Sequence, residues 1–231
     1  MKSTDDPLTL FYKVLFYMDQ QHASLETLQD IRRIMDRSSR FLSLSGLSGV
    51  SAGVFALIGV YFAYDWIYEY YVRYNQRGYD NADFQHLKWS LLGLAGAVML
   101  AALVFAFYFT WRQTRKTNVH IWDPTARKLL LNMLIPLVAG GIFILGLLKY
   151  NDWRFVAPAT LIFYGLALVN ASKYTFGDVR YLGFLEILLG LINMWYIGYG
   201  LYFWGVGFGL LHIVYGSIMW WKYEADKSLS H

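Results

Sequence analysis

The sequence predicts an all-α fold: a polytopic membrane helix bundle with six transmembrane helices, arranged as three hairpins and preceded by amphipathic N-terminal cytoplasmic helices. Apolar residues make up 57% of the 231-residue chain and charged residues 16%, against about 25% charged in ordinary globular proteins. The apolar residues form runs of roughly 20, the length that a helix needs to cross a bilayer. Lys and Arg gather in alternate connecting segments, as the positive-inside rule requires. Together these observations predict a chain that crosses a membrane repeatedly.

Six apolar runs qualify as spans, and the last two need an argument because they are continuous in sequence. Residues 181 to 221 contain only two ionisable groups besides tyrosines, Glu186 and His212. One helix of that length would be about 60 Å long, twice the roughly 30 Å hydrocarbon core. We expect a turn at Gly198-Tyr199-Gly200, where glycine makes turning easy, because a turn at Gly205–Gly207 would leave the last helix short. The predicted spans are Phe41–Tyr64, Trp89–Trp111, Leu129–Leu148, Phe155–Ser172, Tyr181–Tyr199 and Leu201–Trp221.

The first 40 residues are too polar to enter the bilayer. Asp6-Pro7 is a typical helix start, and the eleven residues Leu8–Met18 are too few to span, so an in-plane helix at the membrane surface is expected. A second amphipathic helix is expected from Ser24 into the first span, and its apolar face either packs under the bundle or binds a partner. The predicted domains are residues 1–40, a cytoplasmic amphipathic helical segment; residues 41–221, the six-helix transmembrane domain; and residues 222–231, a cytoplasmic tail.

The first outer connection, Asp65 to Lys88, is rich in tyrosine and mixed charge. It could stack on a glycan or a protein partner. The alternative is a helical extension of the first span with a turn at Arg77-Gly78, and tyrosines at the level of the lipid headgroups.

The distribution of basic residues predicts the orientation. With the N-terminus inside, the cytoplasmic segments hold fifteen Lys and Arg and the outer segments hold five. This excess predicts both termini in the cytoplasm, and we expect a bacterial cytoplasmic (inner) membrane.

Short echoes between spans favour an internal repeat. Ala52-Gly53 precedes Gly59 at the same spacing as Ala139-Gly140 precedes Gly146, which favours three tandem hairpins. Small residues are expected to let helices approach closely. The candidates for close approach are Gly46, Gly49 and Gly53 in the first span, Gly93 and Ala97 in the second, and Gly205 and Gly209 in the sixth.

Two ionisable side chains lie within predicted spans. Burying a charge in a membrane is costly, so such groups are taken as candidates for a function. Glu186 lies about 8 Å and His212 about 13 Å from the cytoplasmic edge, on neighbouring spans. Gly183, Glu186, Gly190 and Asn193 recur at helical spacing and form one stripe. The candidate intramembrane polar pocket comprises Glu186, His212, Asn132, Asn170, Tyr215 and Asn193.

Three interpretations of this pocket stay open. The polar groups can simply bond helices together, with Glu186 held neutral. They can line a pathway for a solute or an ion, or they can form a switch that senses a proton or a ligand.

No catalytic residues, cofactor or metal are predicted. The chain has no cysteine, which excludes disulfides, thiolate metal sites and cysteine nucleophiles. It also lacks a phosphate-binding glycine loop ahead of a lysine and a paired-histidine zinc helix. The basic run Arg112-Gln113-Thr114-Arg115-Lys116 favours acidic lipid headgroups, so we expect the lipid bilayer and no nucleic acid as a partner.

The glycine-punctuated spans, with Ala139-Gly140-Gly141, Gly146 and Tyr164-Gly165, resemble those of the HdeD-like small bacterial membrane proteins. That resemblance implies a six-span hairpin-repeat fold and a link to acid stress, and it implies no catalytic residues. The segment from Arg40 to Val50 looks like membrane proteins of unknown function from Bacteroidetes-type bacteria. Leu185-Glu186-Ile187 is similar to the membrane-embedded glutamate segments of six-span acid-gated urea channels.

The sequence therefore predicts a non-enzymatic membrane protein that acts as a scaffold, sensor or assembly subunit. In this prediction a homo-oligomer or a membrane complex forms through residues 1–40. The alternative is a small-solute or proton-linked channel or transporter that uses the pocket around Glu186 and His212.

Overall fold

The computed structural model describes residues 45–117 and 124–225, and within these ranges the chain is helical apart from short turns, with no strand. All of them belong to the compact unit Phe41–His231. The predicted helices of residues 1–40 and most of the predicted tail lie outside the described residues. The helices are α2 (Gly46–Arg77), α3 (Asn81–Thr117), α4 (Pro124–Lys149), η1 (Trp153–Phe155), α5 (Val156–Ala171), α6 (Val179–Trp195), η2 (Ile197–Tyr199), α7 (Gly200–Trp204), η3 (Gly205–Leu211), α8 (His212–Trp220) and η4 (Trp221–Ala225).

Five helical stretches of the described chain are long and apolar enough to cross a membrane: Gly46–Arg77, Asn81–Arg115, Pro124–Lys149, Trp153–Ala171 and Ile197–Tyr223. Five of the six predicted spans therefore correspond to such a stretch. The remaining predicted span corresponds to α6, a shorter helix of 17 residues.

The first span continues as a helix well beyond its predicted end. α2 has 32 residues, about 48 Å of helix, and it ends where Gly78 adopts a positive φ of 81°. The alternative of a helical extension with a turn at Arg77-Gly78 is therefore confirmed. A side chain at Gly78 would strain this conformation, which glycine adopts freely.

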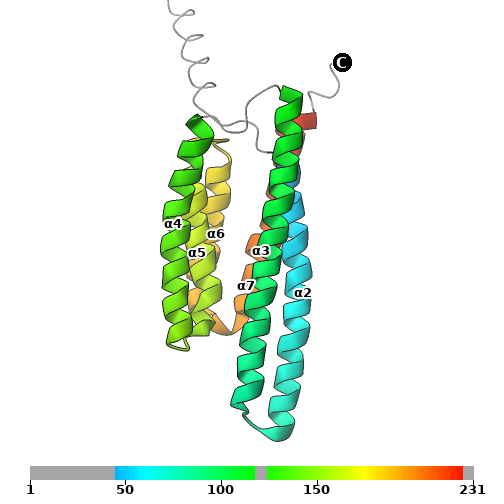
Figure 1. Cartoon of the computed structure of the whole chain (residues 1–231), viewed down its shortest axis with the longest axis vertical. Coiled ribbons are helices and arrows are strands. Elements are labelled where there is room, and N and C mark those ends of the chain that lie inside the picture. Colours follow the sequence, from blue (N-terminus) through cyan, green and yellow to red (C-terminus); the bar gives the residue numbers. More distant parts are fainter. Residues whose placement is uncertain (1–44, 118–123, 226–231) are drawn as a thin grey trace, which may run out of the picture. The chain divides into compact units, whose positions relative to one another are not determined.

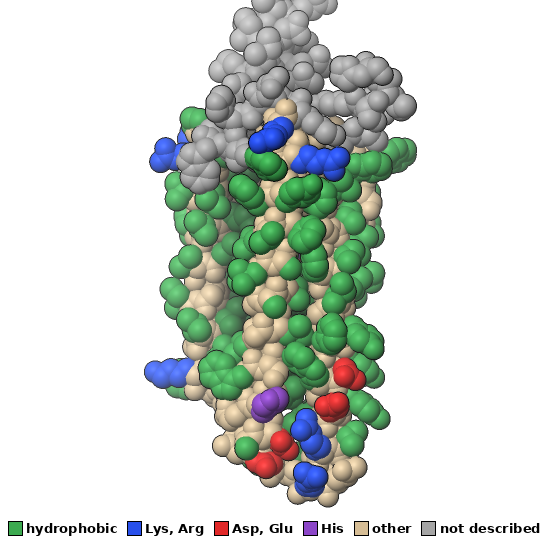
Figure 2. Space-filling view, turned by 45° about the vertical axis from the view of Figure 1, so that its right-hand side comes forward, with side chains coloured by type: hydrophobic (Ala, Val, Ile, Leu, Met, Phe, Trp, Pro, Cys, Tyr) green, Lys and Arg blue, Asp and Glu red, His purple; other side chains and the backbone are tan. Residues whose placement is uncertain are grey.

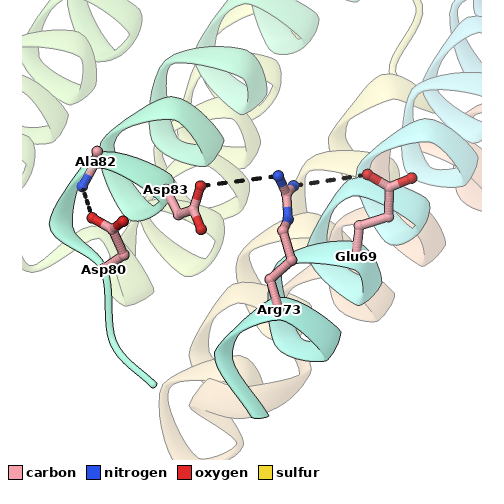
Figure 3. A network of polar contacts seen from close by, with 5 residues as sticks. All are labelled: Glu69, Arg73, Asp80, Ala82 and Asp83. Atoms are coloured by element: carbon pink, nitrogen blue, oxygen red, sulfur yellow. Dashed lines mark hydrogen bonds and ion pairs between the residues drawn. The ribbon is translucent and has the colours of Figure 1, made fainter. Parts of the chain in front are cut away.

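Polar contacts hold the turn between α2 and α3 (Figure 3). The Arg73 guanidinium lies 3.8 Å from the Glu69 carboxylate on its own helix and 3.9 Å from the Asp83 carboxylate on α3. The Asp80 side chain accepts a hydrogen bond of 2.8 Å from the Ala82 N–H, which satisfies a free amide at the start of α3.

The predicted break between the last two spans is confirmed. α6 ends at Trp195, the 3₁₀ turn Ile197–Tyr199 follows, and α7 begins at Gly200. The rival turn position, Gly205–Gly207, lies instead at the start of the π-helical segment η3, through which the helix continues into α8.

The helices pack in a chain of neighbours (Figure 1). α3 packs along α2, α2 packs along η3 and α8, and α4 packs on α5, which in turn packs closely on α6. Figure 2 shows hydrophobic side chains over the middle of the face that it draws, with Lys and Arg near its two ends. This distribution is the one expected of a membrane-spanning bundle.

Glycines set the closest approaches between helices. A Cβ at Gly165 would lie 2.6 Å from the Gly183 carbonyl oxygen, and one at Gly216 would lie 2.6 Å from the Gly46 carbonyl oxygen. The prediction for the first span and for Gly205 and Gly209 is confirmed, because these glycines face α8 and α2 at short range. The prediction for Gly93 is wrong: nothing lies within 4 Å of a Cβ built there. Small size permits close approach, but only a facing helix produces it.

Candidate functional site

The small-residue stripe of α6 faces the interior along its whole length. Gly183, Glu186, Gly190 and Asn193 are all buried. The glycines of the stripe press against α5, since a Cβ at Gly183 would lie 2.7 Å from the Gly165 carbonyl oxygen and one at Gly190 would lie 2.9 Å from that of Pro158. The two glycines thereby bring the α5 backbone close to α6 on both sides of Glu186.

Glu186 is fully buried, with 0% of its surface exposed. Neither of its carboxyl oxygens has a hydrogen-bond partner among the described residues. Its Oε2 lies against η3, where a Cβ at Gly207 would come within 2.5 Å of it. A side chain at position 207 would displace this carboxyl group from its present position, so the site depends on η3 as well as on α6.

His212 connects the carboxyl group to two other helices. Its Nδ1 lies 3.4 Å from Glu186 Oε1 and 3.0 Å from the Gly207 carbonyl oxygen, and its Nε2 lies 2.8 Å from the Tyr164 hydroxyl oxygen. A carbonyl oxygen only accepts, so Nδ1 carries a proton and donates it to Gly207. In the neutral imidazole, Nε2 then accepts the hydroxyl proton of Tyr164. The contact with Glu186 is thus short but not a hydrogen bond, because the Nδ1–H is used by Gly207.

The π-helical geometry of η3 is part of the site. The buried residues of η3 are Gly205, Gly207 and Gly209. A Cβ added at Gly209 would collide with the Leu57 side chain of α2. A π-helix widens the helical turn by one residue and is often found at functional positions. Here the Gly207 carbonyl oxygen accepts a hydrogen bond from the Nδ1–H of His212, five residues further along.

Aromatic rings surround the imidazole. The Phe208 ring lies 5.0 Å from the Tyr164 ring and 5.9 Å from the His212 ring, measured between centroids, and the Trp204 ring lies 4.9 Å from Phe208. These rings keep the local dielectric constant low, which strengthens the electrostatic interactions of Glu186 and His212.

The structure brings Glu186 and His212 together and leaves the other predicted pocket residues elsewhere. Asn132 donates to the Lys128 carbonyl oxygen of its own helix at 2.8 Å, and Asn170 lies half-buried in the last turn of α5. Asn193 is fully buried and donates to the Tyr196 carbonyl oxygen at 3.0 Å, where it closes the end of α6, while its Oδ1 has no partner in the described chain.

Tyr215 lies one helical turn from His212 on α8, and it packs against a different group, the buried apolar cluster of Leu168, Phe176, Val179, Leu182 and Met219. Its hydroxyl group is buried, and no other described residue forms a hydrogen bond with it. Similar depth was therefore insufficient to bring Asn132, Asn170 and Tyr215 to Glu186, because helical rotation decides which way each side chain points. Asn193 shares the face of Glu186 but lies about two helical turns further along α6.

A second group of polar side chains lies at the N-terminal end of α6. One oxygen of Asp178, Oδ2, accepts hydrogen bonds of 2.7 Å from both Lys222 Nζ and the Tyr223 hydroxyl group. The hydrogen bond from Lys222 lowers the pKa of Asp178, partial burial opposes this shift, and the bond from Tyr223 adds to it. We call Asp178, Lys222 and Tyr223 the latch, because they fasten the end of α8 and η4 to the connection between α5 and α6.

Sequence reasoning missed Tyr164 and Gly207 as site residues. Tyr164 lies about 12 Å from the end of its predicted span, close to the predicted depth of His212, so the depth count that paired Glu186 with His212 could have included it. No comparable signal marks Gly207, because its role follows from the π-helical turn.

The site holds two groups that can each gain or lose a proton, the carboxyl group of Glu186 and the imidazole of His212. When Glu186 is a carboxylate and His212 is a neutral imidazole, the site carries one negative charge. Adding one proton to this state leaves the site without net charge. Within the described chain, no three His, Asp or Glu side chains converge as metal ligands.

The chain matches no family model, and no curated protein and no solved structure matches it significantly.

Proposed function

We propose that the chain is a six-span membrane protein without enzymatic activity, with α6 as the additional crossing and both termini in the cytoplasm of a bacterium. α6 has 17 residues, about 26 Å of helix, which approaches the roughly 30 Å hydrocarbon core. It is flanked by the turn at Ile197–Tyr199 and by the latch, so its ends have the polar or turn residues that a short span requires. The count of fifteen to five basic residues supports the orientation. In this arrangement the six spans pair as three hairpins.

The function that the geometry supports best is a sensor that responds to a proton at Glu186. The observation that carries this proposal is the fully buried carboxyl group of Glu186. Its two oxygens have no hydrogen-bond partner in the described chain, and one of them lies 3.4 Å from His212 Nδ1. A charge at membrane depth costs at least about 2.5–3.5 kcal/mol, so adding or removing a proton here changes the free energy of packing between α6 and η3. That change is what a switch needs, since it favours one arrangement of helices over another.

Infrared spectroscopy tests the proposal directly. The purified protein in lipid nanodiscs is titrated between about pH 4 and pH 9, the range in which buried carboxyl groups and histidines exchange protons. We expect a carbonyl band of a protonated carboxylic acid that changes with pH and is missing from Glu186→Gln. A spectrum without any pH-dependent band that requires Glu186 would overturn the proposal. Glu69→Gln is the control, because Glu69 is exposed on the outer turn of α2.

A proton-linked channel or transporter is the second candidate, and the π-helical segment beside the carboxyl group favours it. Irregular helices whose backbone groups face a buried site are typical of membrane transporters. In liposomes that contain a pH-sensitive dye, an imposed pH gradient should then collapse faster with the wild type than with Glu186→Gln or His212→Ala. Equal rates for the wild type, both variants and empty liposomes would exclude proton conduction and leave the sensor.

A sensor also needs an output, for which we propose the cytoplasmic segment 1–40. In the helix predicted from Ser24, apolar residues fall on one face and charged residues lie mostly away from it, as in a partner-binding amphipathic helix. A chain lacking residues 1–38 should keep its transmembrane domain folded and lose the proteins, or the second copy, that co-purify with the full chain. Identical co-purification with the full and shortened chains would contradict this assignment.

A further inference from the structure

The imidazole of His212 has one N–H group and two acceptors within its reach. Nδ1 lies 3.0 Å from the Gly207 carbonyl oxygen and 3.4 Å from Glu186 Oε1. The N–H donates to Gly207, while the carboxyl oxygens accept no hydrogen bond from the described chain. The second acceptor is therefore only slightly further from the donor than the first, and it is unused.

The unused acceptor indicates which protonation state the structure shows. Glu186 is fully buried, and a buried carboxylate without a donor costs far more free energy than a neutral carboxyl group does. A neutral carboxyl oxygen also competes weakly for a donor that already has a carbonyl acceptor, because the strong hydrogen bonds are those to a charged group. The arrangement is thus the one expected when Glu186 carries its proton.

The two hydrogen bonds open to His212 differ in which helices they join. The bond to Gly207 lies within one continuous helix, because it links the first residue of α8 to the π-helical turn of η3 five residues earlier. A bond to Glu186 would instead link α8 to α6. Three of the seven residues of η3 are glycine, which weakens a helix, so the loss of the imidazole bond should loosen this turn.

The other ring nitrogen keeps the donor available. Nε2 lies 2.8 Å from the Tyr164 hydroxyl oxygen and accepts its proton, which holds the single proton of the neutral ring on Nδ1. Nδ1 therefore has a proton to donate whichever acceptor it faces. Because Tyr164 belongs to α5, a turn of the ring toward Glu186 also changes a contact between α5 and α8.

Few titratable groups of the described chain face Glu186, so a change at His212 can be assigned to it. α5 contributes Tyr164, and η3 has no titratable side chain. α8 contributes His212, whereas Tyr215 packs against the buried apolar cluster. α2, which packs on α8 and η3, has no titratable side chain from Gly46 to Val60. The tyrosines of η2 and α7 are exposed, namely Tyr199 and Tyr202.

We propose that the Nδ1–H of His212 changes its acceptor from Gly207 to Glu186 when Glu186 loses its proton, and that this exchange loosens the π-helical turn of η3. The inference rests on the proposed proton-responsive role of Glu186 and names the device that carries its signal to the helices. In this step the carboxyl O–H bond breaks and the proton goes to water. The imidazole stays neutral, and the carboxylate gains a charge-assisted hydrogen bond, about twice as strong as the neutral bond that it replaces.

Two measurements on the full chain in lipid nanodiscs test the exchange over the pH range in which the infrared band of Glu186 changes. The first is nuclear magnetic resonance of ¹⁵N-labelled histidine. The chain has five histidines, so replacing the other four by glutamine leaves the resonances of His212 alone. The Nδ1–H proton should move downfield as Glu186 loses its proton, because a carboxylate replaces a carbonyl oxygen as its acceptor.

The second measurement is amide hydrogen exchange of η3, corrected for its intrinsic rate. Once Glu186 is a carboxylate, the corrected rate should rise about threefold, the effect of one hydrogen bond of average strength in a membrane protein. Glu186→Gln keeps the size of the side chain and stays uncharged, so both measurements should keep their acid values at every pH. Glu69→Gln is the matched control, because Glu69 is exposed on α2, and it should respond to pH as the wild type does.

A further variant removes the donor itself. His212→Phe keeps a ring at this position without an N–H, so η3 should exchange at the fast rate at every pH. The comparison of the wild type with Glu186→Gln does not depend on whether His212→Phe folds.

The possible negative results have different meanings. If the wild type shows no pH-dependent band of Glu186, the proposed function fails and the acceptor exchange fails with it. If the band changes with pH while the Nδ1–H resonance and the exchange of η3 stay constant, the acceptor exchange is wrong and the proposed function stands. Protonation of both ring nitrogens as Glu186 loses its proton would also overturn the acceptor exchange, because the proton would then have moved to the imidazole.

Discussion

At the scale of residues, the imidazole of His212 is the side chain on which the site depends. It accepts from Tyr164 of α5, donates to Gly207 of η3 and lies 3.4 Å from Glu186 of α6. Each contact comes from a different helical segment, so the ring orientation and its tautomer report how those segments are placed. Loss of any one partner should therefore alter the site before it alters the fold.

Replacing Tyr164 by Phe tests the hydrogen bond to His212. The variant leaves Nε2 buried without a donor, and hydrogen bonds between membrane helices contribute about 0.6 kcal/mol on average and up to about 1.7 kcal/mol. We expect a loss of stability of this size in a reversible unfolding titration, together with a shift of the imidazole resonances in nuclear magnetic resonance. Tyr202→Phe is the control, since Tyr202 is exposed. Unchanged imidazole resonances in Tyr164→Phe would contradict the hydrogen bond.

The latch should depend on pH with a sign that the pKa of Asp178 determines. Its pKa is lowered in the folded protein, so the latch contributes stability above the pKa of the unfolded chain, near 3.9, and loses it as pH falls through the lower folded value. Amide hydrogen exchange at the end of α8, corrected for its intrinsic rate, should rise roughly threefold across this acid range. In Asp178→Asn the corrected rate should be high at every pH, and a wild-type rate that falls in acid would refute the assignment.

At the scale of elements, a glycine-rich helix packs closely only where another helix faces its glycines. α5 and α6 touch through Gly165 and Gly183, where each Cβ would meet the backbone of the other helix. Gly141 of α4 belongs to an equally glycine-rich segment, yet nothing lies within 4 Å of a Cβ built there. Close contact, and with it the van der Waals energy that holds membrane helices together, belongs to the first pair.

A matched pair of leucine substitutions measures this difference. Gly165→Leu forces a side chain into the α6 backbone and should destabilise the bundle by about 1–3 kcal/mol or prevent its folding. Gly141→Leu adds the same side chain to open space and should change stability by less than about 0.5 kcal/mol. Unfolding in a denaturing detergent, followed by circular dichroism, compares the two. Equal destabilisation by both variants would show that α4 has a packing partner at Gly141.

At the scale of the whole molecule, the question is how many times the chain crosses the membrane. Six crossings leave both termini on one side, whereas five crossings, with α6 not spanning, leave them on opposite sides. The chain has no cysteine, so single cysteines can be introduced without background. Ser3→Cys, Lys173→Cys and Ser228→Cys should react with a membrane-impermeant maleimide from the same side, and Tyr79→Cys should react from the other. Labelling of Ser3→Cys and Ser228→Cys from opposite sides would show that the number of crossings is odd.

The sequence by itself determined the features that depend on local composition. The helical class and the long apolar runs follow from the 57% apolar content and its clustering, and the two helix breaks follow from Gly78 and Gly198-Tyr199-Gly200. These are properties of short segments, and a glycine turn or an apolar run has the same physical meaning in most contexts. The pairing of Glu186 with His212 was also within reach, because depth along a helix can be counted in residues.

Only the tertiary structure decided which side chains meet. Asn132 and Asn170 have suitable depth but lie on other parts of their helices, while Tyr164 and Gly207 complete the site from α5 and η3. Gly93 and Gly165 both lie within apolar runs, yet one faces open space and the other faces a backbone. The physical reason is rotation: residue count gives the height of a side chain on a helix, but its direction toward a neighbour depends on how the helices pack. The π-helical turn at η3 adds one residue to a turn and so changes that direction in a way that composition does not reveal.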